Sequence, residues 1–192
     1  MKKIIALFGL GVLSLGLLFG FSNSNVYAST GSDTPQVMYS VLPESTIVTD
    51  EGVTIDVYKT PLLRAGGNGS WDLKGTEPWI LNGNGTPQKD STYRSSGGDY
   101  MMRVPAHKLY SKTPIYDLGP STAVTLYEED PDNPDDYVTS WTVFPSSTSK
   151  DYVVRNINRF LDGANNYAEF YTMHENMYST DGGRIEGVKY YD

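Results

Sequence analysis

An acidic stretch between two apolar runs holds the densest set of chemical groups in the sequence. From Tyr127 to Tyr137 it reads YEEDPDNPDDY, with six carboxylates inside nine residues. Closely spaced carboxylates can bind calcium, which takes about six to eight oxygen ligands. They can also do acid–base work when one member of a pair has a raised pKa. The candidate calcium ligands are Asp130, Asp132, Asp135 and Asp136.

The spacing of these acids does not fit an EF-hand, which requires a glycine after its third ligand position. Here Asn133 is followed by Pro134. The simpler interpretation is a polar turn between two antiparallel strands, shaped by its prolines and rich in turn-forming Asp and Asn. A glycosidase-type acid pair needs an apolar setting, whereas this run is expected to be wet. Calcium is therefore the one cofactor that the sequence leaves open.

Nucleophilic catalysis has little support in the sequence. There is no cysteine, so thiolate chemistry, zinc–thiolate sites and disulfides are excluded. The two histidines, His107 and His174, lie in no G-x-S-x-G or H-E-x-x-H context, and His174 is expected at the surface or partly paired. Ser147 to Lys150 satisfies S-x-x-K but lacks the S-D-N and K-T-G partners of that motif. The sequence thus predicts no catalytic residues.

Aromatic side chains are the remaining candidates for recognition. The chain has 15 tyrosines and 3 tryptophans, and Trp71, Trp79 and Tyr93 lie in or beside glycine-rich segments. Tyrosine and tryptophan rings can stack on sugar rings at a surface or fill a core. The three residues are candidate ligand-binding residues, with core packing of the tryptophans and cross-strand tyrosine pairs as the alternative.

The elements that position these groups are short β-type runs separated by Gly, Pro, Asn and Asp. About nine such runs in one cysteine-free domain predict an all-β fold, a β-sandwich or jelly roll, with a closed barrel as the second choice. Residues 150–161 are compatible with one short helix or with a strand and turn. The runs span residues 37–42, 53–59, 70–74, 78–81, 99–104, 122–129, 136–144, 166–173 and 184–191.

The first 28 residues have the pattern of a secretory signal peptide. Lys2 and Lys3 precede an uncharged apolar run from Ile4 to Phe21, and Val26 and Ala28 supply the small residues of a cleavage site. Cleavage after Ala28 would leave a lead-in over residues 29–45 and one β-domain over 46–192. We therefore predict a secreted, extracellular, bacterial protein with no membrane anchor after cleavage.

The charge balance restricts the partners of the processed chain. Removing Lys2 and Lys3 leaves 13 basic against 23 acidic residues, a formal charge of −10. Such a surface repels nucleic acid and anionic lipids. We predict a non-enzymatic binding module for a neutral glycan or a protein. The alternatives are a secreted antimicrobial or toxin-like factor and a hydrolase with a carboxylate site that the sequence does not reveal.

Overall fold

The computed structural model describes residues 42–59, 71–109, 119–130, 133–161, 166–177 and 182–192. The signal sequence, most of the lead-in and the strand predicted over 37–42 lie outside these residues, apart from Leu42 at its end. No helix in the described part of the chain has the length and hydropathy to cross a bilayer. The described elements are β1 (Ser45–Val48), β2 (Thr54–Tyr58), β3 (Leu73–Leu81), β4 (Gln88–Lys89), β5 (Tyr93–Ser95), β6 (Tyr100–Val104), β7 (Thr122–Glu128), β8 (Asp136–Val143), β9 (Lys150–Val154), the 3-10 helix η1 (Ile157–Phe160), β10 (Ala168–Asn176) and β11 (Gly183–Tyr191).

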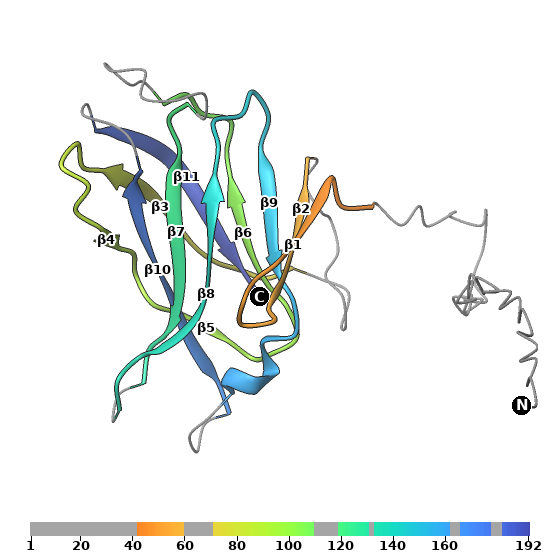
Figure 1. Ribbon diagram of the computed structural model, residues 1–192. Helices are drawn as coiled ribbons and strands as arrows, with labels where there is room; N and C mark the ends of the chain where they lie inside the picture. The colour runs from red at the N-terminus through yellow and green to blue at the C-terminus, as the bar shows by residue number, and fades with distance from the viewer. Residues whose placement is uncertain (1–41, 60–70, 110–118, 131–132, 162–165, 178–181) are drawn as a thin grey trace, which may run out of the picture. The chain divides into compact units, whose positions relative to one another are not determined.

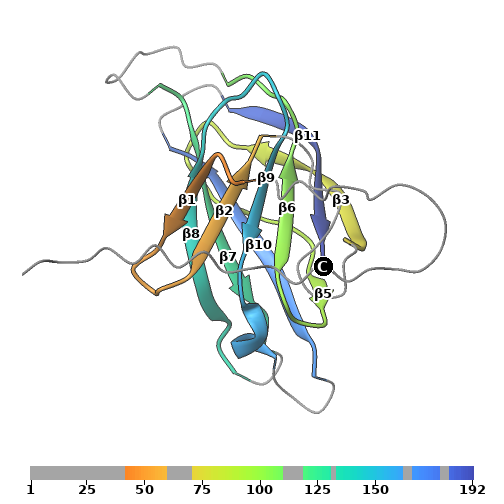
Figure 2. The ribbon, with the colours of Figure 1, turned by 90° about the vertical axis from the view of Figure 1, so that its right-hand side faces the viewer.

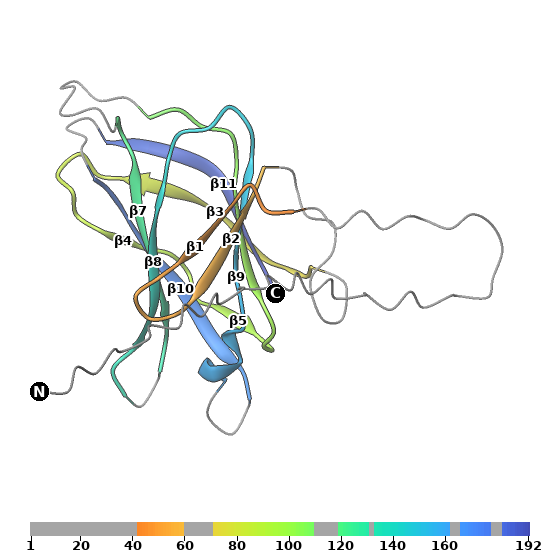
Figure 3. The ribbon, with the colours of Figure 1, turned by 45° about the vertical axis from the view of Figure 1, so that its right-hand side comes forward.

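These strands form two antiparallel sheets that face each other (Figures 1 and 2). The six-stranded sheet has the order β1-β2-β9-β6-β11-β3. The five-stranded sheet has the order β4-β10-β7-β8, and β5 also pairs with β10. The turned view in Figure 3 shows β1 and β8, the edge strands of the two sheets, on the same side of the fold. The predicted all-β, sandwich-like fold is confirmed.

One hydrophobic core fills the space between the sheets. Its side chains come from both sheets, because residues that alternate along each strand face the opposite layer. Each fully buried large apolar side chain contributes about 1.5–3 kcal/mol to folding, before the entropy cost of ordering it. The largest fully buried apolar side chains of this core are Trp79, Tyr100, Tyr190, Phe170, Ile55, Leu81, Met102, Leu126, Ile157 and Ile185.

The structure differs from the predicted elements in three respects. The separate strands predicted over 70–74 and 78–81 are one strand, β3, which continues through Pro78 because β3 is an edge strand and can lack one ladder donor. Residues 150–161 are a strand followed by a 3-10 turn, so each alternative describes part of the segment. Three short strands, β1, β4 and β5, were not predicted. Among the described strands β1 has a single partner, β2, and most of its residues are exposed.

The alternation of buried and exposed residues in β8 is interrupted by a bulge. Leu126 pairs with Thr139 while Tyr127 pairs with Tyr137, so Val138 is an extra residue in β8. A bulge puts two neighbouring residues on the same side of the strand, and both Val138 and Thr139 are buried. Beyond the bulge the period of two resumes, with Trp141 and Val143 facing the core.

Candidate binding groove

Two adjoining hollows lie where the strand edges of the two sheets come together, and we call them the edge groove. The hollows share Pro145 and Ser146, in the connection from β8 to β9. The first has a volume of about 460 Å³ and the second about 560 Å³. The first is lined by Glu44, Ser45, Ile47, Val57, Thr142, Phe144, Pro145, Ser146, Lys150 and Tyr152, and the second by Ala106, His107, Lys108, Pro145, Ser146 and Ser147.

The first hollow combines an exposed aromatic ring with hydroxyl groups. Phe144 follows β8 directly and its side chain is 51% exposed, which is unusual for a phenylalanine. Thr142 lies two residues earlier and lines the same hollow, as strand alternation requires. Across the hollow, β9 contributes Tyr152, whose ring stacks on Trp141 with centroids 6.1 Å apart. The stacked pair joins the two sheets beneath the hollow.

The charges that line this hollow are paired. Lys150 forms an ion pair with Glu44, and the hydrogen bond from Lys150 lowers the pKa of Glu44. Burial raises the pKa of Tyr152 to about 12, so its phenol is neutral at physiological pH. The hollow therefore presents aromatic, aliphatic and hydroxyl groups with no net charge from this pair. Such a surface suits an uncharged ligand.

The second hollow contains a histidine with a defined tautomer. His107 pairs with Ser146 in a β-bridge, with both backbone hydrogen bonds present at 2.9 and 3.2 Å. Nδ1 of His107 lies 2.9 Å from the carbonyl oxygen of Pro105. Because a carbonyl only accepts, Nδ1 is the donor in this contact. Nε2 is buried and has no hydrogen-bond partner among the described residues, so the histidine lines the hollow without presenting that nitrogen to it.

A second set of polar side chains lies buried between the sheets, and we call it the Asp90 cluster. Oδ2 of Asp90 accepts hydrogen bonds from Trp79 Nε1 at 2.9 Å, from Thr172 Oγ1 and from the Tyr190 hydroxyl. Trp79 also stacks on His174, with ring centroids 5.1 Å apart and planes at 16°. Burial, followed by the charge of Asp90, raises the pKa of Tyr190 far above its usual range.

Asp90 and His174 are the nearest approach to an acid–base pair in the described residues. Nδ1 of His174 lies 3.3 Å from Oδ1 of Asp90, which is within ion-pair distance, but neither ring nitrogen has a partner with hydrogen-bond geometry. Asp90 is only 7% exposed and His174 only 2%, and neither residue lines the edge groove. Of the two alternatives expected for His174, a surface position is wrong because its position in β10 faces the core, and its closeness to Asp90 is compatible with a partly paired histidine. The cluster is placed to hold the sheets together.

The three aromatic candidates have different surroundings and form no common platform. Trp79 is fully buried with both ring faces in the core, so it is not available to a sugar, and the prediction is corrected at this residue. Tyr93 is partly buried, stacks on Tyr190 at 4.8 Å and donates to Glu77. Trp71 packs against a small apolar cluster that includes Met101, on the outer face of the six-stranded sheet. Sequence proximity in loops did not bring the three rings together.

The acidic stretch is the connection of the β7–β8 hairpin. Glu128 pairs with Asp136 across the two antiparallel strands, as expected for the turn interpretation. Asp135 accepts from the Tyr171 hydroxyl at 2.6 Å, and Asp130 accepts from the Asn133 amide at 3.0 Å. Glu128 itself is almost fully buried, so the acidic stretch is less exposed to solvent than the sequence suggested.

Of the four candidate calcium ligands, Asp132 lies outside the described residues. Among the residues that are described, no group of three or more acidic or histidine side chains has a metal-binding arrangement.

The fold is a two-sheet antiparallel β-sandwich with the edge groove along one side. The family model described as the YndA coiled coil domain matches residues 74–186. The protein YndA of Bacillus subtilis strain 168 is 34% identical over 128 residues, which cover 66% of this chain and 76% of YndA. No solved structure matches the chain. The chain therefore belongs to the YndA family and has a bacterial homologue.

The family's description does not fit the architecture of this chain. A coiled coil requires helices with apolar residues at heptad spacing. Within residues 74–186 the described elements are the strands from β3 to β11 and the four-residue helix η1. The period of two in β7, whose burial alternates at every residue, is that of a half-buried strand.

Proposed function

We propose that this protein is a secreted, non-enzymatic binding module that takes a neutral glycan in the edge groove. The observation that carries the proposal is the exposed ring of Phe144 beside hydroxyl groups and a compensated ion pair. Aromatic rings stack on the apolar faces of sugars, while hydroxyl side chains exchange hydrogen bonds with the sugar hydroxyls. The acidic chain favours neutral over anionic polymers.

The binding test compares two exposed aromatic residues of the same edge. Phe144→Ala removes the ring in the groove, and Tyr137→Ala removes an exposed ring at the other end of β8, outside the groove. Neutral oligosaccharides are titrated by calorimetry after a screen on a glycan array. We expect Phe144→Ala to weaken binding by about tenfold or more, equivalent to about 1.4 kcal/mol, and Tyr137→Ala to leave it unchanged. Equal effects of the two variants would contradict the groove as the site.

Secretion is tested separately from binding. The N-terminal sequence of residues 1–28 supports export and cleavage after Ala28. Expression in a bacterial host, followed by N-terminal sequencing of protein from the medium, is expected to give a chain that starts at Ser29. Retention of the uncleaved chain with the cells would contradict this part of the proposal.

A protein ligand is the second candidate, and the edge strands favour it. Among the described strands, β1 and β8 each pair on one side alone, so the other side of each offers backbone donors and acceptors to an extended polypeptide. Binding of this type would depend on backbone pairing. A proline that removes a donor from the free side of β8 would then reduce binding more than Phe144→Ala does.

A further inference from the structure

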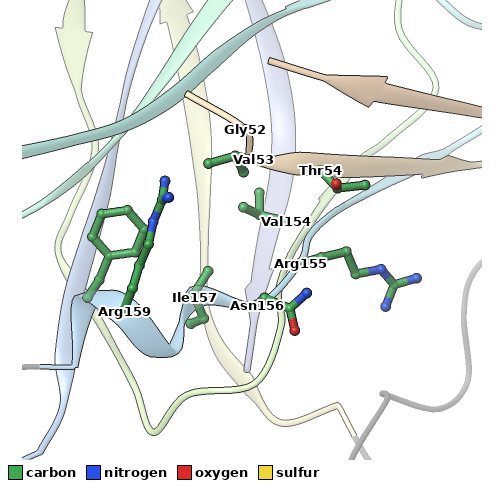
Figure 4. A pocket seen from close by; sticks show the side chains of 9 residues that line it. Gly52, Val53, Thr54, Val154, Arg155, Asn156, Ile157 and Arg159 are labelled. Atoms are coloured by element: carbon green, nitrogen blue, oxygen red, sulfur yellow. The ribbon is translucent and has the colours of Figure 1, made fainter. Parts of the chain in front are cut away.

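A separate small pocket lies at the turn end of the β1–β2 hairpin, beside η1 (Figure 4). Its volume is about 240 Å³, below the roughly 300 Å³ at which sites for drug-sized ligands begin. The pocket therefore has room for one residue-sized group. Val53, Val154 and Ile157, all buried, supply its apolar wall.

The other wall is carried by η1, which is fixed to the turn before β6. Asn156 adopts a left-handed conformation with φ of 56° and redirects the chain after β9. The backbone N–H of Ile157 then donates to Gly98 O at 3.0 Å, and the N–H of Gly98 donates to Oδ1 of Asn158 at 2.8 Å. These two bonds hold the turn that presents Arg159 and Phe160 to the pocket.

The two arginines that line the pocket differ in their partners. Arg155 is engaged by Asp56 at 2.8 Å and Asp99 at 2.6 Å, and it also donates to Tyr58. Figure 4 shows its side chain directed away from Arg159. The guanidinium carbon of Arg159 lies 4.8 Å from the centre of the Phe160 ring, and in the described part of the chain it has no carboxylate partner.

We propose that this pocket binds a carboxylate attached to a small apolar group. The planar guanidinium of Arg159 matches a carboxylate with two parallel hydrogen bonds, and stacking on Phe160 restrains its orientation. The apolar part of the ligand lies against the Phe160 ring and Val53, which have more exposed surface than Val154 and Ile157. A free acyl amino acid and the C-terminal residue of a peptide both have this chemistry. The site is independent of the edge groove.

The test uses ligands that differ in charge alone. N-acetyl-leucine and N-acetyl-leucinamide are titrated into the purified protein and followed by NMR, together with a tetrapeptide that ends in leucine. The variants are Arg159→Gln, Arg159→Lys and the control Arg94→Gln, which removes an exposed arginine of β5 that does not line the pocket. Thermal melts confirm that each variant is folded.

We expect the carboxylate to bind the natural protein and Arg94→Gln at least tenfold more tightly than the amide. Arg159→Gln should lose this preference, and Arg159→Lys should keep part of it because the charge remains while the planar fork is lost. Tighter binding of the tetrapeptide than of the free acid would identify a chain terminus as the ligand. Equal binding of acid and amide, a preference that survives in Arg159→Gln, or no binding at about 10 mM ligand would overturn the proposal.

Discussion

Replacing Asp90 tests whether the buried polar cluster holds the two sheets together. In Asp90→Ala, the donors on Trp79, Thr172 and Tyr190 lose their shared acceptor inside the core. A hydrogen bond to a charged group contributes about 1.5–3 kcal/mol. With three donors, we expect the free energy of unfolding to fall by about 4 kcal/mol or more, a large part of the roughly 5–15 kcal/mol of a typical domain.

The assay is urea unfolding followed by tryptophan fluorescence, with thermal melts as a second measure. For a domain of this size the expected loss corresponds to a fall in Tm of about 10 °C. Asp90→Asn serves as the matched variant, because its side-chain oxygen can still accept from the three donors while its amide faces His174. It should cost clearly less than Asp90→Ala.

A double-mutant cycle separates the cluster from simple loss of packing. Asp90→Ala and Tyr190→Phe remove the two ends of one hydrogen bond, so their effects should be coupled by about 1 kcal/mol or more. A loss below about 1 kcal/mol for Asp90→Ala, or strict additivity in the cycle, would refute the argument that this carboxylate is the shared acceptor of the core.

Three further predictions follow from particular residues. Burial raises the pKa of Tyr152 to about 12 from 10.0, so the unfolded chain loses this proton at a lower pH than the folded chain does. The free energy of unfolding, measured across this range, should therefore fall as the pH rises from 10 to 12. It should fall less in Tyr152→Phe, which lacks the phenol. In Gly75→Ala the new Cβ would lie 2.1 Å from the Tyr93 ring, and this clash should lower the free energy of unfolding in a urea titration by about 1–3 kcal/mol. Adding Tyr93→Ala removes the clashing ring, so much of the loss caused by Gly75→Ala should disappear in the double variant. Thermal melts in chelator and in calcium should coincide, because Asp135 already accepts from Tyr171; a calcium-specific rise that disappears in Asp130→Asn would instead establish a metal site.

The fold class was predictable because burial on one face leaves a period of two in the sequence. β7 and β10 show that alternation over most of their lengths, and their bounds fall close to the predicted ones. The short strands β4 and β5 have too few residues to show any period. The single strand β3 was divided in the prediction because Gly75 and Pro78 are normally strand breakers, and its edge position cannot be read from local sequence.

The candidate sites were less predictable because they depend on contacts between distant residues. Asp90 and His174 are 84 positions apart, and they meet because β4 pairs with β10. His107 and Ser146 meet through one β-bridge. Phe144 could have been noticed from sequence as an aromatic residue directly before a proline at the end of a strand. That position does not by itself show that the ring of Phe144 is exposed while the ring of Phe170 is buried.

The place of β11 in the six-stranded sheet has a consequence for how the chain acquires its structure. β11 is the last strand of the described chain, yet it lies between β6 and β3 and is the strand that joins β3 to the sheet. Residues of β3 near position 77 therefore pair with residues of β11 near position 188, about 110 positions later in the chain. Sheets closed by such long-range pairing form slowly. Closure of the six-stranded sheet therefore requires nearly the whole described chain, from β1 to β11, to be available.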